Sequence, residues 1–163
     1  MEIAFTLNGA PRRLTADADA RLVTLLRERL DLRASKLACG IGRCGACMVL
    51  LDGQPANACL LMAWQVDGRA VTTPEGLESG PAAATAQRIR ASLAAENAFQ
   101  CGYCASGVVA SLTALFEANQ GAGEAEIRRA LEGHVCRCTG YHSIIRGALA
   151  AGAALRARSE DTA

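Results

Sequence analysis

The sequence has no excess of charge of either sign, because 17 basic residues stand against 16 acidic ones and the formal net charge is +1. Without a basic patch or a long run of like charges, nucleic acid is a poor candidate for a partner. No stretch approaches the roughly 18 apolar residues of a membrane span. The N-terminal stretch MEIAFTLNGAPRRLTAD has no basic segment followed by an apolar one, as a signal peptide would. We therefore expect a cytoplasmic protein, periplasmic only if a partner with an export signal carries it.

Aromatic residues are also scarce, at 4% of the 163 residues, although 51% of the chain is hydrophobic. This length suits one sizeable domain or two small ones. What the sequence has in excess is cysteine, with eight residues. Because nothing in the sequence indicates secretion, and a reducing cytosol disfavours disulfides, clustered thiols are better explained as metal ligands.

Strand and turn signals fill the first half of the chain. Residues 2–16 are predicted to form a hairpin that turns at Asn8-Gly9, and residues 48–60 a second hairpin that turns at Asp52-Gly53. A helix is predicted over residues 20–32, where leucines recur at helical spacing, and a short strand over residues 69–73. This half is therefore expected to be α+β.

Helical patterns fill the second half. Residues 73–81 concentrate Pro and Gly without periodicity and are the predicted linker. Four helical stretches follow, separated by Gly-containing breaks, as is typical of a small helical bundle; they cover residues 82–99, 106–120, 123–133 and 142–157. We expect one domain over residues 1–76, a helical domain over 82–155 and a flexible tail over 156–163.

The first cysteine set has the spacing C-x4-C-x2-C followed by a fourth cysteine after eleven residues, and comprises Cys39, Cys44, Cys47 and Cys59. This is the plant-type ferredoxin spacing, in which four thiolates hold a 2Fe–2S cluster. The interleaved glycines Gly40, Gly42 and Gly45 let a loop turn sharply and direct backbone N–H groups at the sulfurs. They also match G-x-G-x-x-G, but a dinucleotide site would need a following helix where a strand is predicted.

The second cysteine set comprises Cys101, Cys104, Cys136 and Cys138, spaced as C-x2-C and C-x-C. Four thiolates can bind zinc or a second 2Fe–2S cluster, and the C-x-C arm is less usual for zinc. Two sets in one chain favour an electron relay. Since each set is complete without them, His134 and His142 are expected to be polar residues at helix ends. Trp64 is expected in the core, and Tyr103 is expected to pack over the second set.

The motifs CGIGRCGACMVLLDG…NACL, FQCGYC and CRCTGYHSII occur in this order. In them the chain resembles the iron–sulfur small subunit of the molybdenum hydroxylases, the family of xanthine dehydrogenase, aldehyde oxidase and carbon monoxide dehydrogenase. The resemblance covers roughly residues 2–150. It implies an α+β fold, with an N-terminal β-grasp domain like plant-type ferredoxins and a C-terminal four-helix bundle. Each domain would hold one 2Fe–2S cluster, the first set binding the outer cluster and the second set the inner one.

The resemblance also implies partners and a role. The inner cluster would lie near a molybdopterin (cytosine dinucleotide) cofactor held by a separate large subunit. Gln100 corresponds to the family glutamine that contacts the pterin, and Cys138 to the ligand cysteine beside the pterin ring. The chain would carry no catalytic residue. It would pass electrons from the molybdopterin through both clusters to an FAD-binding medium subunit or a cytochrome.

Two alternatives to this role stay open, a free-standing ferredoxin-like carrier and a zinc-stabilised interaction module. A simple carrier needs only the first domain, so the helical second half argues against it. The chain also departs from the family pattern near the second set. Ala105-Ser106 stands where Thr-Pro is usual, and His134 where asparagine is usual. Both departures are expected to lie around the inner cluster.

Overall fold

The computed structural model describes residues 1–161. Strands β1 (Glu2–Leu7) and β2 (Ala10–Thr15) form the first predicted hairpin, and β3 (Met48–Leu51) and β4 (Gln54–Asn57) form the second. Both turns need two residues with left-handed backbone, which Asn-Gly and Asp-Gly supply readily. The φ angles are 51° and 82° at Asn8 and Gly9, and 50° and 80° at Asp52 and Gly53. Both predicted hairpins are thus confirmed.

Strand β5 (Ala70–Thr72) joins the two hairpins into one mixed sheet of order β2-β1-β5-β3-β4. It pairs parallel with β1 and antiparallel with β3. The predicted helix over 20–32 is shorter than expected, since α1 (Leu22–Thr24) widens into the π-helix η1 (Leu25–Arg29). These helices and α2 (Ala63–Val66) bury apolar side chains against β1, whose alternate residues Ile3, Phe5 and Leu7 face the same core.

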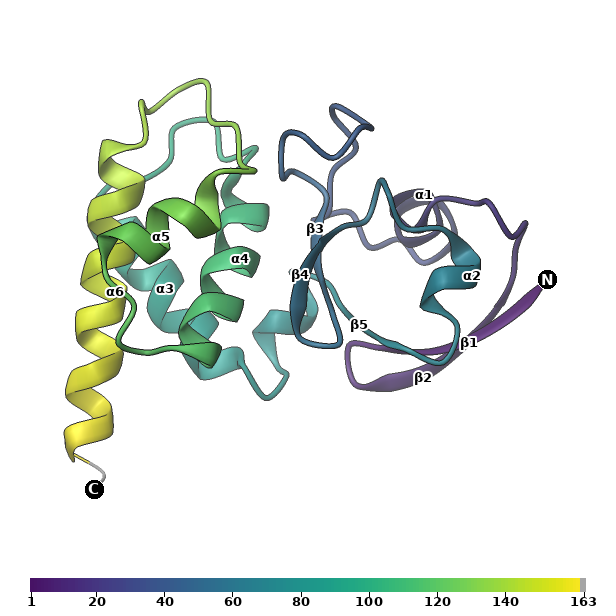
Figure 1. Cartoon of the computed structure of the whole chain (residues 1–163), viewed down its shortest axis with the longest axis horizontal. Helices are drawn as coiled ribbons and strands as arrows, with labels where there is room; N and C mark the ends of the chain where they lie inside the picture. The colour runs from purple at the N-terminus through teal and green to yellow at the C-terminus, as the bar shows by residue number, and fades with distance from the viewer. Residues whose placement is uncertain (162–163) are drawn as a thin grey trace.

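The second half is helical, as predicted. It contains α3 (Ala83–Ala95), α4 (Ala105–Ala118), α5 (Glu124–Leu131) and α6 (His142–Asp161), which enclose a second apolar core (Figure 1). Phe116, Leu112 and Ile127 are fully buried there. The α+β class is confirmed. The predicted linker contains a short 3-10 helix, η2 (Gly76–Glu78). The predicted tail is helical as far as Asp161, and residues 162–163 lie outside the described residues.

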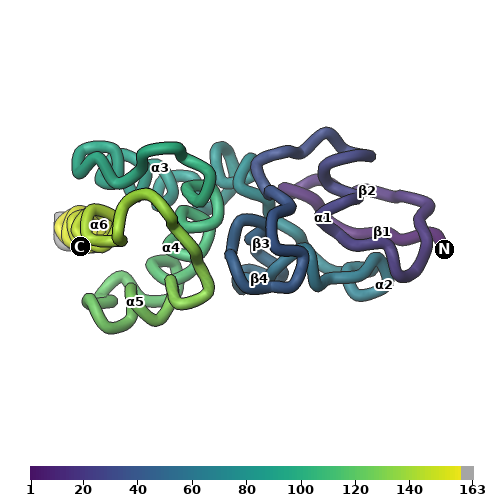
Figure 2. The backbone as a smooth tube through the Cα atoms, turned by 90° about the horizontal axis from the view of Figure 1, so that it is seen from above, coloured from purple at the N-terminus to yellow at the C-terminus, as the bar shows by residue number. Residues whose placement is uncertain are grey.

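Strand β3 joins the two halves. All four of its residues are buried. Met48 and Leu50 belong to the core of the helical half, whereas Val49 and Leu51 belong to the core of the sheet half. This follows from the two-residue period of a strand, which points successive side chains to opposite faces. Helix α4 packs on the outer face of β3, and Figure 2 shows the two elements side by side at the junction. None of the helices in the described part of the chain is long and apolar enough to cross a membrane.

Candidate iron–sulfur sites

Three cysteines of the first set, Cys39, Cys44 and Cys47, lie in the turn-rich loop that precedes β3. Gly40, Gly42 and Gly45 all have left-handed backbone, with φ of 67°, 73° and 70°. A residue with a side chain would be strained at these positions. The turns bring backbone N–H groups toward the sulfur of Cys39, to which the N–H of Arg43 donates at 3.3 Å.

The positions of the remaining cysteines of this set are fixed by the second hairpin. Cys47 directly precedes β3 and Cys59 follows β4, so the antiparallel pairing brings the two residues together. The N–H of Ala58 donates to the carbonyl oxygen of Cys47 at 3.2 Å, which extends the ladder to this point. Cys47 and Cys59 are buried, whereas Cys39 and Cys44 are partly exposed.

The thiols of the first set differ in acidity for physical reasons. The backbone N–H groups of Ile41 and Arg43 lower the pKa of Cys39 to about 6, because they stabilise its thiolate. Burial raises the pKa of Cys47 to about 12. A buried thiolate therefore needs a bound metal to replace its proton, and a coordinating metal deprotonates a thiol outright. The donor set and its N–H groups fit an anionic iron–sulfur cluster.

The second cysteine set lies where two loops of the helical half meet. Cys101 and Cys104 precede α4, with Cys104 as its N-terminal cap residue, and the left-handed Gly102 lies between them. Cys136 and Cys138 lie in the loop between α5 and α6. The sulfurs of Cys101 and Cys138 are 3.5 Å apart. Burial raises the pKa of Cys104 to about 12, so this site too needs a bound cation to ionise all four thiols.

The loop that carries Cys136 and Cys138 is braced by Tyr141, which has a left-handed φ of 68°. Its hydroxyl accepts a hydrogen bond from the N–H of Cys136 at 2.9 Å and donates to the carbonyl oxygen of His134 at 3.1 Å. Thr139 Oγ1 lies 3.1 Å from the sulfur of Cys136. Gln100 lies at the other end of the site, where its Nε2 donates to the carbonyl oxygen of Cys138 at 3.1 Å.

Both sets are arranged as pairs of thiols. All eight cysteines are free, and within residues 1–161 no three His, Cys, Asp or Glu side chains converge on a single metal ion. Side-chain contacts join Cys39 to Cys44, Cys47 to Cys59, Cys101 to Cys138, and Cys104 to Cys136. A 2Fe–2S cluster takes two thiolates on each of its irons, whereas zinc takes four ligands around one ion. The pairing therefore suits the cluster better.

The two sets are linked by a direct backbone contact. The N–H of Val135, the residue before Cys136, donates to the carbonyl oxygen of Cys44 at 3.1 Å. Residues of the second half also lie tightly against the loop of residues 39–47, which carries three cysteines of the first set and is called the first cluster loop below. A Cβ at Gly107 in α4 would lie 2.1 Å from the carbonyl oxygen of Gly45, so the absence of a side chain permits this approach.

His134 lies in the same contact between the two halves. It follows the C-terminal end of α5, where its N–H donates to the carbonyl oxygen of Leu131 at 2.9 Å, in agreement with the predicted polar residue at a helix end. Its ring is buried, with Nε2 2.8 Å from Ser111 Oγ and with Nδ1 unpartnered among the described residues. A Cβ at Gly45 would lie 2.3 Å from Nδ1. Burial lowers the pKa of His134 to about 4, so the ring is neutral at pH 7. Nothing local in the sequence indicates this packing role.

Two further predictions concern aromatic residues. The prediction that Trp64 lies in the core is wrong, since it is 57% exposed. Apolar residues are common on surfaces, so hydrophobicity alone did not decide its position. Tyr103, between Cys101 and Cys104, is 47% exposed and presents its ring to the ammonium group of Lys36, whose Nζ is 5.5 Å from the ring centroid.

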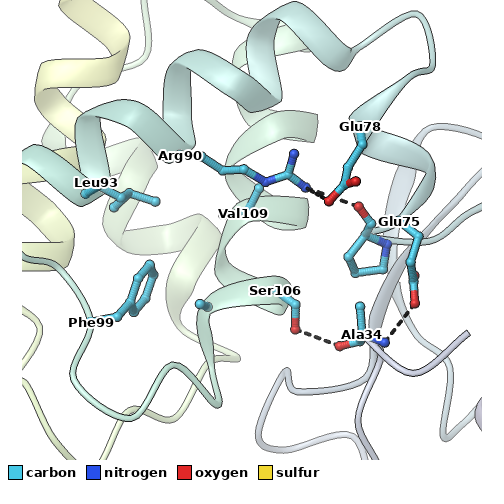
Figure 3. Close-up of a pocket in the computed structure, with 11 residues that line it drawn as sticks. Ala34, Glu75, Glu78, Arg90, Leu93, Phe99, Ser106 and Val109 are labelled. Carbon is cyan, nitrogen blue, oxygen red and sulfur yellow. Dashed lines mark hydrogen bonds and ion pairs between the residues drawn. The ribbon is translucent and has the colours of Figure 1, made fainter.

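A cavity of about 370 Å³ lies at the junction of the two halves, between the η2 segment, α3 and α4 (Figure 3). Its wall is apolar, with Leu93, Phe99 and Val109, and Arg90 and Glu78 lie at its edge. None of the eight cysteines lines it. It is thus separate from both cysteine sets.

The sequence matches two protein families over nearly its whole length. Residues 5–77 match the family described as "2Fe-2S iron-sulfur cluster binding domain", and residues 73–149 the family described as "[2Fe-2S] binding domain". A probable xanthine dehydrogenase subunit of Bacillus subtilis is 41% identical over 147 residues, which are 90% of this chain and 83% of that protein. The nicotine 6-hydroxylase small subunit of Paenarthrobacter nicotinovorans is 38% identical over 149 residues, 91% of this chain and 88% of that one.

The chain belongs to the iron–sulfur subunit family of the molybdenum hydroxylases. Solved structures agree with this assignment. A chain of quinoline 2-oxidoreductase from Pseudomonas putida 86 superposes with a TM-score of 0.85 at 34% identity, covering 96% of both chains. The aldehyde oxidoreductase of Desulfovibrio desulfuricans gives a TM-score of 0.83 at 33% identity, over 96% of this chain but 17% of that longer one. The iron–sulfur subunit is thus a 2Fe–2S-binding component of an oxidoreductase, with a ferredoxin-like first half.

Proposed function

We propose that this subunit conducts electrons from a molybdopterin cofactor, held by a separate large subunit, through two 2Fe–2S clusters to an acceptor. The acceptor would be a flavin in a medium subunit or a cytochrome. Each cluster, when bound, accepts and releases one electron at a time. The observation that carries the proposal is the presence of two complete cysteine sets in paired arrangement. A reducing compartment such as the cytoplasm suits the eight free thiols.

We assign Cys39, Cys44, Cys47 and Cys59 as ligands of the outer cluster, and Cys101, Cys104, Cys136 and Cys138 as ligands of the inner one. The buried Cys47 and Cys104 would anchor each cluster in the protein, and the more exposed members would face its open side. The halves themselves would be a β-grasp domain and a four-helix bundle, an assignment supported by the mixed sheet and by the four helices around one core.

We assign the exposed side of the second set as the point where electrons enter. Cys101 and Cys138 are both exposed there, and Gln100 is held against Cys138 by its hydrogen bond. A glutamine amide keeps one donor and its acceptor oxygen available for a pterin, whose ring carries complementary groups. Gln100 and Cys138 would then contact the molybdopterin together.

Between the inner and the outer site, one direct connection in this chain crosses a single hydrogen bond. It runs from Cys136 through the peptide of Val135 to the carbonyl oxygen of Cys44. Both ends of this bond belong to or adjoin a cysteine ligand, so it joins the sites without a side chain between them. On the outer side, Leu37, Ile41 and Leu60 expose apolar surface beside the first set, which suits contact with a protein that carries the acceptor.

The test is the Cys138→Ser variant, studied in the complex that co-purifies with the chain. We expect it to impair the inner cluster and to block substrate-driven reduction of the outer one, while Cys39→Ser should impair the outer cluster and leave the inner one reducible. Iron content and electron paramagnetic resonance measure both clusters. Wild-type protein should contain about four irons per chain.

Other results of the same experiment would select the alternatives. A colourless protein that contains zinc would support the interaction module. A chain with both clusters that purifies without a large subunit would support a free carrier. Unchanged cluster signals and turnover in Cys138→Ser would refute the ligand assignment.

A further inference from the structure

Lys36 is the only lysine in the sequence, and every other basic residue is arginine. It lies in the loop of the first half that leads to Cys39, yet its side chain reaches the second half. The ammonium Nζ donates to Ser106 Oγ at 2.9 Å and to the carbonyl oxygen of Ala34 at 3.0 Å, and it lies 5.5 Å from the centroid of the Tyr103 ring. A compact ammonium with three donors fits these three acceptors.

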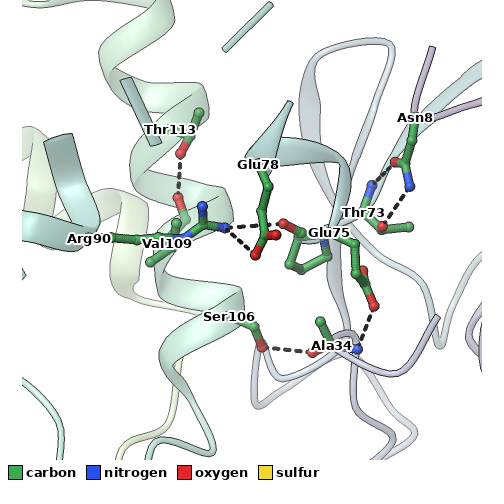
Figure 4. Close-up of polar contacts among 10 residues, drawn as sticks. Asn8, Ala34, Thr73, Glu75, Glu78, Arg90, Ser106, Val109 and Thr113 are labelled. Carbon is green, nitrogen blue, oxygen red and sulfur yellow. Dashed lines mark hydrogen bonds and ion pairs between the residues drawn. The ribbon is translucent and has the colours of Figure 1, made fainter. Parts of the chain in front are cut away.

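These contacts hold the charge close to the second cysteine set. Tyr103 and Ser106 lie on either side of Cys104 in the sequence. Cys104 is buried and is the N-terminal cap residue of α4. Ser106 is fixed in turn, because its hydroxyl donates to the carbonyl oxygen of Ala34 at 2.7 Å (Figure 4). The hydroxyl thus accepts from Lys36 and donates to Ala34. Proline, which is usual at this position in the family, has no hydroxyl to do either.

The charge of Lys36 is not cancelled by an ion pair. None of the carboxylates in the described part of the chain lies within 4.0 Å of Nζ. The nearby charged groups are Arg27, which opposes the ammonium, and Glu75 and the Cys104 thiol, which favour it. Glu75 is itself engaged, since its Oε1 accepts from the N–H of Ala34 at 2.8 Å (Figure 4). Lys36 is also partly withdrawn from water, so solvent and salt screen its field less than that of a surface cation.

We propose that Lys36 raises the reduction potential of the cluster bound by the second cysteine set, and so helps to set how readily that cluster accepts an electron. The proposal rests on the proposed function, because it requires a cluster at Cys101, Cys104, Cys136 and Cys138. A one-electron reduction adds one negative charge without forming a bond or moving a proton. A fixed cation nearby stabilises the reduced form more than the oxidised form. Backbone N–H groups reach sulfurs of both sets, as at Cys39 and Cys101, whereas the ammonium of Lys36 lies over Tyr103, beside the second set.

The experiment is a redox titration of the full chain in its complex, followed by electron paramagnetic resonance. Each signal is assigned through Cys138→Ser and Cys39→Ser. In Lys36→Met, the ratio of reduced to oxidised second-set cluster at a given potential should fall at least tenfold, a shift of 59 mV for one electron. The first-set cluster should change less than threefold. Lys36→Arg keeps the charge and should retain most of the wild-type ratio, and Arg12→Met removes a distant charge and should change neither cluster.

If Lys36→Met does not retain its clusters, chemical modification of the folded chain gives the same comparison. Acetylation removes the charges of Lys36 and of the distant N-terminal amine, and reductive methylation keeps both. Only the acetylated chain should show the tenfold change. Equal shifts of both clusters, or no shift of the second-set cluster in the neutral forms, would overturn the proposal. Absence of a second cluster in the wild-type chain would instead refute the proposed function.

Discussion

Replacing Gly107 by alanine tests whether the close contact between α4 and the first cluster loop is required. In an exposed helix this change would stabilise the protein, because alanine favours the helical backbone by about 1 kcal/mol over glycine. Here the added Cβ would lie 2.1 Å from the carbonyl oxygen of Gly45 and 3.1 Å from its carbonyl carbon. A gain in stability would therefore indicate that helix propensity dominates, and a loss would indicate that packing between the two halves dominates.

The magnitude follows from which atoms collide. The clash is with backbone, so no side chain can rotate to relieve it, and helix and loop must separate by roughly 1 Å. Overpacking of this kind costs about 1–3 kcal/mol, and rigid surroundings favour the upper end. After the gain in helix propensity, a net loss of about 2 kcal/mol is expected, which lowers the Tm by about 4–8 °C for a chain of this length.

The assay is thermal unfolding of Gly107→Ala beside Gly133→Ala. A Cβ at Gly133 meets nothing within 4 Å, so this control should unfold at or slightly above the wild-type temperature. Gly45 lies between Cys44 and Cys47, so Gly107→Ala should also disturb the signal of the first-set cluster more than that of the second. A Gly107→Ala protein as stable as the control, with both signals unchanged, would refute the reasoning.

Two further predictions concern the pH dependence of stability and the first hairpin. The pKa of His134 in the folded chain, about 4, lies below its ordinary value of 6.5. The stability that the neutral, buried ring gives the folded state is therefore fully present above pH 6.5 and is lost as the pH falls toward 4. Between pH 7 and pH 5, urea unfolding should show wild type losing about 2 kcal/mol more than His134→Asn, and equal losses would contradict this. Asn8 has left-handed backbone, and its side chain bonds Thr73, with Oδ1 accepting from the backbone N–H at 2.8 Å and Nδ2 donating to Oγ1 at 3.1 Å (Figure 4). Asn8→Ala should lower the free energy of unfolding by about 2–4 kcal/mol, and Asn8→Gly, which relieves the backbone strain, by about 1–3 kcal/mol. A Gly variant as unstable as the Ala variant would count against backbone strain.

The features that sequence reasoning predicted well are those set by a few neighbouring residues. Asn8-Gly9 and Asp52-Gly53 specify tight turns because their backbones enter the left-handed region at low cost, and both hairpins formed there. The four helical stretches were also found, with boundaries shifted by a few residues. The grouping of the cysteines into two sets comes from their spacing, and the structure places the members of each set in contact as pairs, whereas their role as cluster ligands stays a prediction.

The features that were missed depend on residues far apart in the chain. His134 is buried because α4 and the first cluster loop close over it, and nothing near position 134 shows this. Trp64 was assigned to the core from its hydrophobicity, but α2 buries Ala63 and Val66 instead. The π-helical turn after Thr24 has the same leucine pattern as an ordinary helix. Likewise, the contact of Ser106 with Lys36 joins residues far apart in the chain, so the sequence around position 106 does not indicate it.

The ring of His134 fills the space beside Gly45 and Gly107, where neither glycine has room for a side chain. A substitution at any one of these three positions therefore restricts which residues the other two can tolerate. A side chain at 45 would need a smaller residue than histidine at 134, and a side chain at 107 would need the loop to retreat. The two halves can therefore be exchanged between related proteins only where the residues at this contact are compatible. A chimaera that joins the first half of one relative to the second half of another takes position 45 from one parent and positions 107 and 134 from the other, so it requires parents whose residues fit together at this contact.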